Sequence, residues 1–106
     1  MTCRILYSPS ARKDLDDVWD GVFEASGSYD IADRYVHGII SEFAEKKDFP
    51  KSGIPLCYRG LFTGFYSVNF KAYKGFYRLK DGNIEVARIL LAKCDYLTIL
   101  FGEPEE

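Results

Sequence analysis

The stretch Tyr73–Leu91, YKGFYRLKDGNIEVARILL, decides the fold. Its Asp-Gly dipeptide stands between two runs rich in aromatic and β-branched residues, and it is the strongest short-range signal of a hairpin with a two-residue turn. Because such a turn fixes the register, five cross-strand pairs are predicted: Leu79 with Ile84, Arg78 with Glu85, Tyr77 with Val86, Phe76 with Ala87, and Gly75 with Arg88. Side-chain alternation then gathers Leu79, Ile84, Tyr77 and Val86 on one apolar face.

Two amphipathic helices are predicted before the hairpin. Ser8 is suited to be the N-cap of the first helix and Pro9 its first residue. Apolar residues follow at the spacing of one buried helical face, at Leu15, Val18, Trp19, Val22 and Phe23. After a Gly/Ser break, apolar residues recur every fourth position from Ile31 to Phe43. A turn this short between two helices indicates an antiparallel helical hairpin.

The other segments complete an α+β fold. Strands are expected at Thr2–Tyr7 and Phe65–Phe70 and a short element at Tyr96–Phe101, whereas prolines and glycines in Phe49–Gly60 predict an irregular crossover. Because the apolar face of the sheet must be covered, we expect the order β-α-α-β-β-β, with a curled antiparallel sheet packed on the helical hairpin. The chain has 106 residues, so residues 1–106 are expected to form one domain.

Composition excludes several classes of protein. Three cysteines without a C-x-x-C pair, together with the single histidine His37, support neither a disulfide framework nor a metal site. We therefore expect no metal and no cofactor. The N-terminal MTCRILYSPS is too weakly apolar for a signal peptide, and no segment approaches the roughly 18 apolar residues of a membrane span. A cytoplasmic protein that does not bind membranes is expected, with a frayed acidic tail, GEPEE.

Charge is distributed in blocks along the chain. Residues 1–48 carry six basic and ten acidic side chains, residues 81–106 carry two and six, and residues 49–80 carry six basic side chains and no acidic one. Within this middle block, Tyr58–Arg78 contains eight aromatic residues. Strand propensity explains part of this composition, since strands are poor in acidic residues and bury about half of their side chains. The alternative is a surface for an anionic or acidic partner.

Several charged side chains are open to more than one interpretation. Arg88 is expected on the core side, where it either pairs with a carboxylate at the rim or occupies a groove that Gly75 keeps open. Arg78 is interpreted as a cross-strand ion pair with Glu85. The acidic residues of the first helix are interpreted as a solvated face rather than a catalytic or metal site: Asp14, Asp16, Asp17, Asp20 and Glu24.

The order of elements and four phrases of the sequence resemble the RelE/ParE superfamily, the small toxins of bacterial type II toxin-antitoxin modules. The phrases are YSPSARKDLDDVWDGVFE, IADRYVHGIISEF, PKSGIP and YKGFYRLKDGNIEVARILLAKCDYLTILF. The first is similar to a ParE-like pattern, S-x-x-A-x-x-D-L-x-x-I-W-x-Y. The resemblance covers nearly the whole chain apart from Leu56–Phe65. It implies a toxin with a cognate antitoxin as its partner.

The superfamily divides by activity. RelE-like members cut messenger RNA in the ribosomal A site, and this branch implies that cations on the late strands stabilise charge at the scissile phosphate. Here those catalytic residues would be Lys74, Arg78, Arg88 and Lys93. Lys74 stands where the family has an arginine, Cys94 replaces a later arginine, and Leu91 stands where ParE-like patterns often have histidine. A sequence pI near 5.4 disfavours a ribosome-entering nuclease, which is helped by a positive surface.

The resemblance therefore implies a ParE-like toxin of a plasmid-stabilisation type of module. By this resemblance the chain is expected to inhibit growth by binding DNA gyrase rather than by cleaving bonds, and the antitoxin is expected to neutralise it. The alternatives are a RelE-like endonuclease acting on ribosome-bound mRNA, which would make the chain an enzyme, and an inactive remnant that only binds its antitoxin. The residues expected to meet the target or antitoxin, converging on one concave patch, are Arg59, Lys71, Lys74, Arg78, Arg88, Lys93 and Tyr96.

Overall fold

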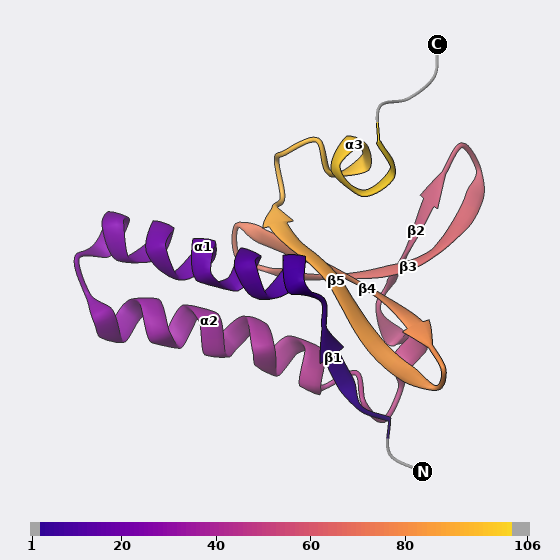
Figure 1. Cartoon of the computed structure of the whole chain (residues 1–106), viewed down its shortest axis with the longest axis horizontal. Coiled ribbons are helices and arrows are strands. Elements are labelled where there is room, and N and C mark those ends of the chain that lie inside the picture. Colours follow the sequence, from indigo (N-terminus) through magenta and orange to yellow (C-terminus); the bar gives the residue numbers. More distant parts are fainter. Residues whose placement is uncertain (1–2, 103–106) are drawn as a thin grey trace.

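The computed structural model describes residues 3–102. The elements are β1 (Ile5–Tyr7), α1 (Pro9–Ser26), α2 (Tyr29–Ala44), the 3₁₀ turn η1 (Pro50–Ser52), β2 (Ile54–Tyr58), β3 (Leu61–Phe70), β4 (Tyr73–Lys80), β5 (Asn83–Leu91) and α3 (Tyr96–Phe101). The strands form one sheet of order β1-β5-β4-β3-β2. The α+β class and the pairing of sheet with helical hairpin are confirmed (Figure 1). The predicted strand start at Thr2 and the predicted frayed tail at residues 103–106 lie outside the described residues.

The segment after α2 contains a strand that its sequence does not predict. Ile54–Tyr58 pairs antiparallel with β3, which begins at Leu61 rather than at Phe65. The prediction of an irregular crossover over Phe49–Gly60 was therefore wrong. Pro55 is tolerated in β2 because this strand lies at the edge of the sheet, where hydrogen bonds are needed on one side only.

The opposite edge of the sheet is also different from the expectation. β1 pairs with β5 in parallel, so the prediction of an antiparallel sheet was wrong for this pair and holds for the other three. β1 ends at Tyr7, and Ser8 continues its hydrogen bonding. The Ser8 N–H donates to the Val86 carbonyl over 3.0 Å, and the Ser8 hydroxyl donates to the Ala87 carbonyl over 2.8 Å.

Local capping sets the bounds of the two long helices, and the predicted Ser8-Pro9 start of the first helix is confirmed. The Ser8 hydroxyl accepts the Ala11 N–H over 3.0 Å at the start of α1, where Pro9 is the first residue. Gly27 ends α1 in the left-handed conformation, with φ of 69°. Ser28 caps α2 by accepting the Ile31 N–H over 3.2 Å. The two helices run antiparallel, and their connecting turn extends beyond the sheet in Figure 1.

The core lies between the helical hairpin and the apolar face of the sheet. Tyr77, Ile84 and Val86 are fully buried there, as the predicted alternation requires, against Phe43 and other helical side chains. A Cβ atom on Gly75 would lie 2.3 Å from Phe43 Cζ. Gly75 therefore provides space for the Phe43 ring, and of the two alternatives for Arg88 the groove beside Gly75 does not form.

The hairpin register holds near the turn and then shifts. Both turn residues have the positive φ of a type I′ turn, 53° at Asp81 and 77° at Gly82. The pairs Leu79–Ile84, Arg78–Glu85 and Tyr77–Val86 are confirmed. A β-bulge then leaves Ala87 without a partner, so that Phe76 faces Arg88 and Gly75 faces Ile89. The predicted pairs Phe76–Ala87 and Gly75–Arg88 were wrong, because Ser8 binds the carbonyls on both sides of the bulge.

Candidate functional site

The bulge moves Arg88 from the core side of the sheet to the opposite face. Lys74 and Arg78 of β4 lie on this face too, because their side chains point away from the core while those of their strand neighbours point into it. α3 covers part of it through Tyr96, whose ring centroid is 5.1 Å from that of Phe76 and 5.2 Å from Lys74 Nζ. Three of the predicted cations and the predicted tyrosine thus lie on one side of the sheet.

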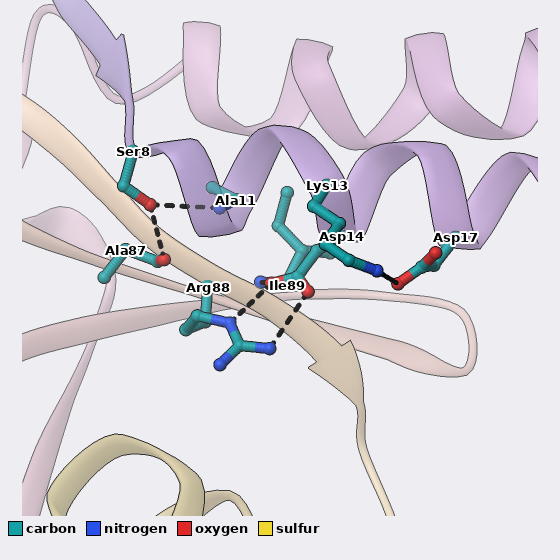
Figure 2. A network of polar contacts seen from close by, with 8 residues as sticks. All are labelled: Ser8, Ala11, Lys13, Asp14, Asp17, Ala87, Arg88 and Ile89. Carbon is teal, nitrogen blue, oxygen red and sulfur yellow. Dashed lines mark hydrogen bonds and ion pairs between the residues drawn. The ribbon is translucent and has the colours of Figure 1, made fainter.

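Arg88 is bound by Asp14 of α1 (Figure 2). Its Nε and Nη2 donate to the two carboxylate oxygens over 2.7 and 3.0 Å, and the Ile89 N–H donates to the same carboxylate over 2.9 Å. The Asp14 side chain is 7% exposed and that of Arg88 30%. The hydrogen bond with Asp14 raises the pKa of Arg88, more than partial burial lowers it, so the guanidinium stays charged. Of the two roles considered for Arg88, the structure has the rim ion pair.

Asp14 corrects the interpretation of the acidic residues of α1 as a solvated face. Asp14 is buried, whereas Asp16, Asp17, Asp20 and Glu24 are exposed. The Asp14 carboxylate lies at the free edge of β5 beyond the end of β1. There it accepts three hydrogen bonds, two from the Arg88 guanidinium and one from the Ile89 N–H. No sequence pattern within α1 distinguishes this aspartate, since its partners lie more than seventy residues away along the chain.

Arg78 is the second cation that is already paired. Its Nε donates to Glu85 Oε1 over 2.7 Å, which confirms the predicted cross-strand ion pair, and its guanidinium lies 5.9 Å from the centroid of the Phe65 ring. A hollow of about 470 Å³ separates this part of the sheet from α3. It is lined by Ser8, Ser10, Phe65, Arg78, Glu85, Ala87, Arg88, Ile99 and Leu100. An anion that enters it meets two arginines that each already bind a carboxylate.

The other predicted site residues lie elsewhere. Arg59 is in the β2–β3 turn, with its guanidinium 5.2 Å from the Tyr58 ring centroid, and Lys71 is in the β3–β4 turn, with Nζ 5.0 Å from the Tyr35 ring centroid on α2. Lys93 is exposed in the connection between β5 and α3. The expectation that all of these cations converge on one patch was wrong for Arg59 and Lys71.

Two apolar surfaces were not predicted. Leu61 and Phe62, 73% and 52% exposed, stand at the tip of the β2–β3 ribbon. At the other end of β2, a hollow of about 540 Å³ is lined by Asp48, Phe49, Pro50, Lys51, Ser52 and Leu79, and Phe49 is 73% exposed. In the sequence, only Phe49 pointed to the second surface, as an isolated aromatic residue before Pro50 in a lysine-rich segment.

Metal-binding side chains and membrane-crossing helices were also sought in residues 3–102. In this part of the chain no three His, Cys, Asp or Glu side chains lie together in a way that could hold a metal ion. No helix within it has both the length and the apolar character needed to cross a membrane.

Comparison with known proteins identifies the class. The fold is that of the RelE/ParE toxins, and the family model described as ParE toxin of the type II toxin-antitoxin system parDE matches residues 5–96. The chain belongs to this ParE toxin family. It is therefore a toxin of the type II toxin-antitoxin class. A search of curated proteins found no match.

Solved structures of toxins share the fold at low sequence identity. A chain of the chromosomal ParDE toxin-antitoxin system from P. aeruginosa is 17% identical, with a TM-score of 0.73, covering 86% of this chain and 97% of that one. The E. coli toxin RelE, as a mutant in the free state, is 14% identical, with a TM-score of 0.62 and 93% of both chains covered. A chain of the RelBE2 toxin-antitoxin complex from Mycobacterium tuberculosis is 19% identical, with a TM-score of 0.60, covering 89% of this chain and 95% of that one.

Proposed function

We propose that this chain is a ParE-like toxin that stops growth by binding DNA gyrase, and that a cognate antitoxin neutralises it. The observation that carries the proposal is the pairing of Arg88 with Asp14 and of Arg78 with Glu85. Membership of the ParE toxin family supports it independently. The toxin acts in the cytoplasm, where its target is found.

The two ion pairs oppose a nuclease mechanism for a physical reason. A nuclease of this fold needs cations that are free to stabilise the charge developing on a phosphate, and such stabilisation depends on groups already directed at that charge. Arg78 and Arg88 are directed at carboxylates of their own chain. Removing Arg88 from Asp14 leaves a buried carboxylate uncompensated, which is costly. Toxicity by binding requires no such rearrangement.

The antitoxin is proposed to bind the hollow beside Phe49. This hollow is lined almost entirely by apolar atoms, and Lys46, Lys47 and Lys51 lie in or next to it in the sequence. An amphipathic helix or extended segment with an apolar anchor and acidic flanks matches both features. Asp48, which also lines the hollow, limits how close a carboxylate can approach. Solved structures described as a ParDE toxin-antitoxin system and a RelBE2 toxin-antitoxin complex support a protein partner of this type.

Induced expression without the antitoxin tests the proposal. Gyrase poisoning predicts accumulation of cleaved plasmid DNA and an SOS response, with intact messages in primer extension. Codon-phased cuts in a reporter message would instead establish the endonuclease. A normal growth curve would establish the inactive remnant.

The RelE-like endonuclease is the second candidate, and one observation favours it. Lys74, Arg78 and Arg88 lie on the same face of the sheet, and both arginines line the hollow beneath α3. Lys74 and Lys93 form no ion pair within residues 3–102, so these lysines remain available to a phosphate.

A further inference from the structure

The edge of β5 is open beyond the end of β1. The pairing of β1 with β5 ends at Val86, whereas β5 continues to Leu91 (Figure 1). On the other side of β5, the Ala92 N–H donates to the Ala72 carbonyl over 2.8 Å. Because every second residue of an antiparallel strand bonds to its partner strand, the backbone groups of Ile89 and Leu91 point away from β4, toward the open edge.

Two of these outward backbone groups have no partner within residues 3–102. The Ile89 N–H donates to Asp14, and the Leu91 carbonyl accepts the Cys94 N–H over 3.1 Å. The Ile89 carbonyl and the Leu91 N–H enter no hydrogen bond in this part of the chain. Unpaired backbone groups at the edge of a sheet are a template for an added strand.

A groove runs along this edge between α1 and the sheet. Its two parts have volumes of about 380 and 370 Å³, and both are lined by Gly21, Tyr73 and Leu91. The first part also borders Ile89, and the second reaches Ser26 at the end of α1. The groove therefore has room for a few residues of extended chain beside the unpaired backbone groups.

Gly21 keeps the groove open on the side of α1. Glycine inside a helix is less favourable than alanine, so a packing reason is expected for it. The chain itself does not supply one, because a Cβ atom at Gly21 would lie 3.7 Å from its nearest neighbour, the Tyr73 hydroxyl, which is an ordinary contact distance. A helical glycine in the wall of a groove permits close approach of another backbone.

The charges of the groove are already paired. The charged residues among its described lining are Asp14, Asp17 and Arg88. Asp14 binds Arg88, and the Asp17 carboxylate lies 3.6 Å from Lys13 Nζ. A nucleic acid, which needs several cations for its phosphates, fits such a groove poorly. The edge of a second copy does not fit either, because its own α1 covers that edge in the same way. An uncharged, extended peptide segment fits both the shape and the charge.

The unpaired groups also define the direction of the added strand. In a parallel pair, one residue bonds to the carbonyl before and to the N–H after the residue that it faces. A guest residue facing Leu90 would therefore bond to both the Ile89 carbonyl and the Leu91 N–H. An antiparallel guest residue would need both groups of Ile89 or both groups of Leu91, and Asp14 or Cys94 already binds one of them.

We propose that an extended, uncharged segment of the antitoxin adds to the sheet in this groove, parallel to β5 and in line with β1, with one residue facing Leu90. This inference rests on the proposed function, which gives the chain a cognate antitoxin. The antitoxin is the protein partner that defines the toxin family to which the chain belongs. The inference extends the antitoxin interface from the hollow beside Phe49 to the open edge of β5.

The test compares Leu91→Pro with Leu91→Ala. Proline removes the N–H at position 91, which β4 does not use, and proline is tolerated at a free strand edge. Alanine shortens the same side chain and keeps the N–H. In calorimetric titration with the antitoxin encoded beside the chain, we expect Leu91→Pro to bind at least about tenfold more weakly than Leu91→Ala, because a carbonyl of the antitoxin loses its donor. Circular dichroism and thermal unfolding verify that both variants are folded.

Two further measurements decide the question if Leu91→Pro does not fold. Gly21→Leu should fill the groove and weaken antitoxin binding at least about tenfold, whereas Gly21→Ala should bind within about twofold of wild type. In the wild-type protein, the exchange of the Leu91 amide with deuterated water is followed by NMR. This exchange should slow at least about tenfold when the antitoxin binds.

Equal affinities of folded Leu91→Pro and Leu91→Ala, or an unchanged exchange rate of the Leu91 amide in the complex, would overturn the inference. Weak binding by Gly21→Leu without protection of that amide would overturn it too, because the partner in the groove would not be a strand. Protection that rises with the concentration of toxin alone would indicate a second copy instead, and protection by a single-stranded oligonucleotide would indicate nucleic acid. None of these assays involves gyrase, so failure of the proposed target leaves their result intact. A wild-type chain that does not bind the antitoxin contradicts both proposals.

Discussion

Asp14 of α1 binds Arg88 of β5 through both carboxylate oxygens and accepts the neighbouring Ile89 N–H as well. One helical side chain thus closes the edge of β5 that β1 is too short to cover, and it holds the Arg88 guanidinium in a fixed position.

Replacing Asp14 by asparagine should destabilise the protein strongly. Breaking a fully buried ion pair costs about 3–5 kcal/mol, and we expect about 2–3 kcal/mol for Asp14→Asn because the asparagine keeps the shape and part of the hydrogen bonding. Urea denaturation measures the difference. Asp16→Asn on the exposed side of α1 is the control, with a change within about 0.5 kcal/mol. Equal stabilities of the two variants would contradict the assigned role of Asp14.

A methyl group on Gly75 should disrupt the core, whereas the same group on Gly21 should not. The added Cβ at position 75 would lie 2.3 Å from Phe43 Cζ, and such overpacking costs typically about 1–3 kcal/mol. At Gly21, in α1, the nearest atom is 3.7 Å away, so Gly21→Ala should stabilise the helix by about 0.5–1 kcal/mol. Thermal unfolding of both variants checks the opposite signs. Stabilisation by Gly75→Ala would show that the Phe43 ring is not fixed over this position.

Tyr77 should contribute to stability through its hydroxyl, which donates to the Pro50 carbonyl over 2.7 Å and accepts the Gly53 N–H over 3.0 Å. These bonds attach the α2–β2 connection to the sheet. Tyr77→Phe removes both, at a cost of about 1–3 kcal/mol. Tyr66→Phe, which keeps the ring stacked on Tyr77, is the control.

The same hydroxyl predicts a dependence on alkaline pH. Burial raises the pKa of Tyr77 above its ordinary value of 10.0, although the bond from Gly53 N–H lowers it. The folded state favours the neutral hydroxyl of Tyr77. The stability that this hydroxyl contributes is therefore fully present below pH 10 and is lost as the pH rises through the pKa that Tyr77 has in the folded protein. Wild-type stability should therefore fall above about pH 10, and Tyr77→Phe should fall less steeply. If the free energy of unfolding fell equally steeply with pH in both proteins, Tyr77 would not be the group responsible.

Phe49 should matter for neutralisation and not for toxicity. Phe49→Ser removes the exposed ring beside the apolar hollow, and we expect the affinity for the antitoxin to fall at least about tenfold, as for interface anchors. Growth inhibition without antitoxin should be unchanged, and co-expressed antitoxin should no longer restore growth. A folded Phe49→Ser variant that binds the antitoxin normally would exclude the hollow from the interface.

The sequence predicts the elements that depend on local signals. The Ser8-Pro9 helix start, the Gly/Ser break between the two helices and the Asp-Gly turn of the β4–β5 hairpin depend on backbone conformations within a few residues, and all three form as expected. The Arg78–Glu85 pair follows from the turn, because it lies before the bulge.

The errors concern contacts between segments far apart in the chain. The bulge at Ala87 depends on hydrogen bonds from Ser8, so a register counted from the turn alone places Arg88 on the wrong face. The sequence of α1 does not distinguish Asp14 from its exposed acidic neighbours, because Asp14 is buried only by its contacts with β5. The strand Ile54–Tyr58 was missed because the two prolines and two glycines of Phe49–Gly60 locally favour irregular structure, while pairing with β3 overrides that preference.

Inhibition of purified gyrase tests the central claim most directly. Wild-type toxin, prepared by dissociating its antitoxin complex and refolding, is added to gyrase with relaxed plasmid and ATP. The account predicts loss of supercoiling activity, restored when the antitoxin is added in equimolar amount. Undisturbed supercoiling, together with codon-phased cleavage of mRNA when the same preparation is added to translating ribosomes, would contradict it.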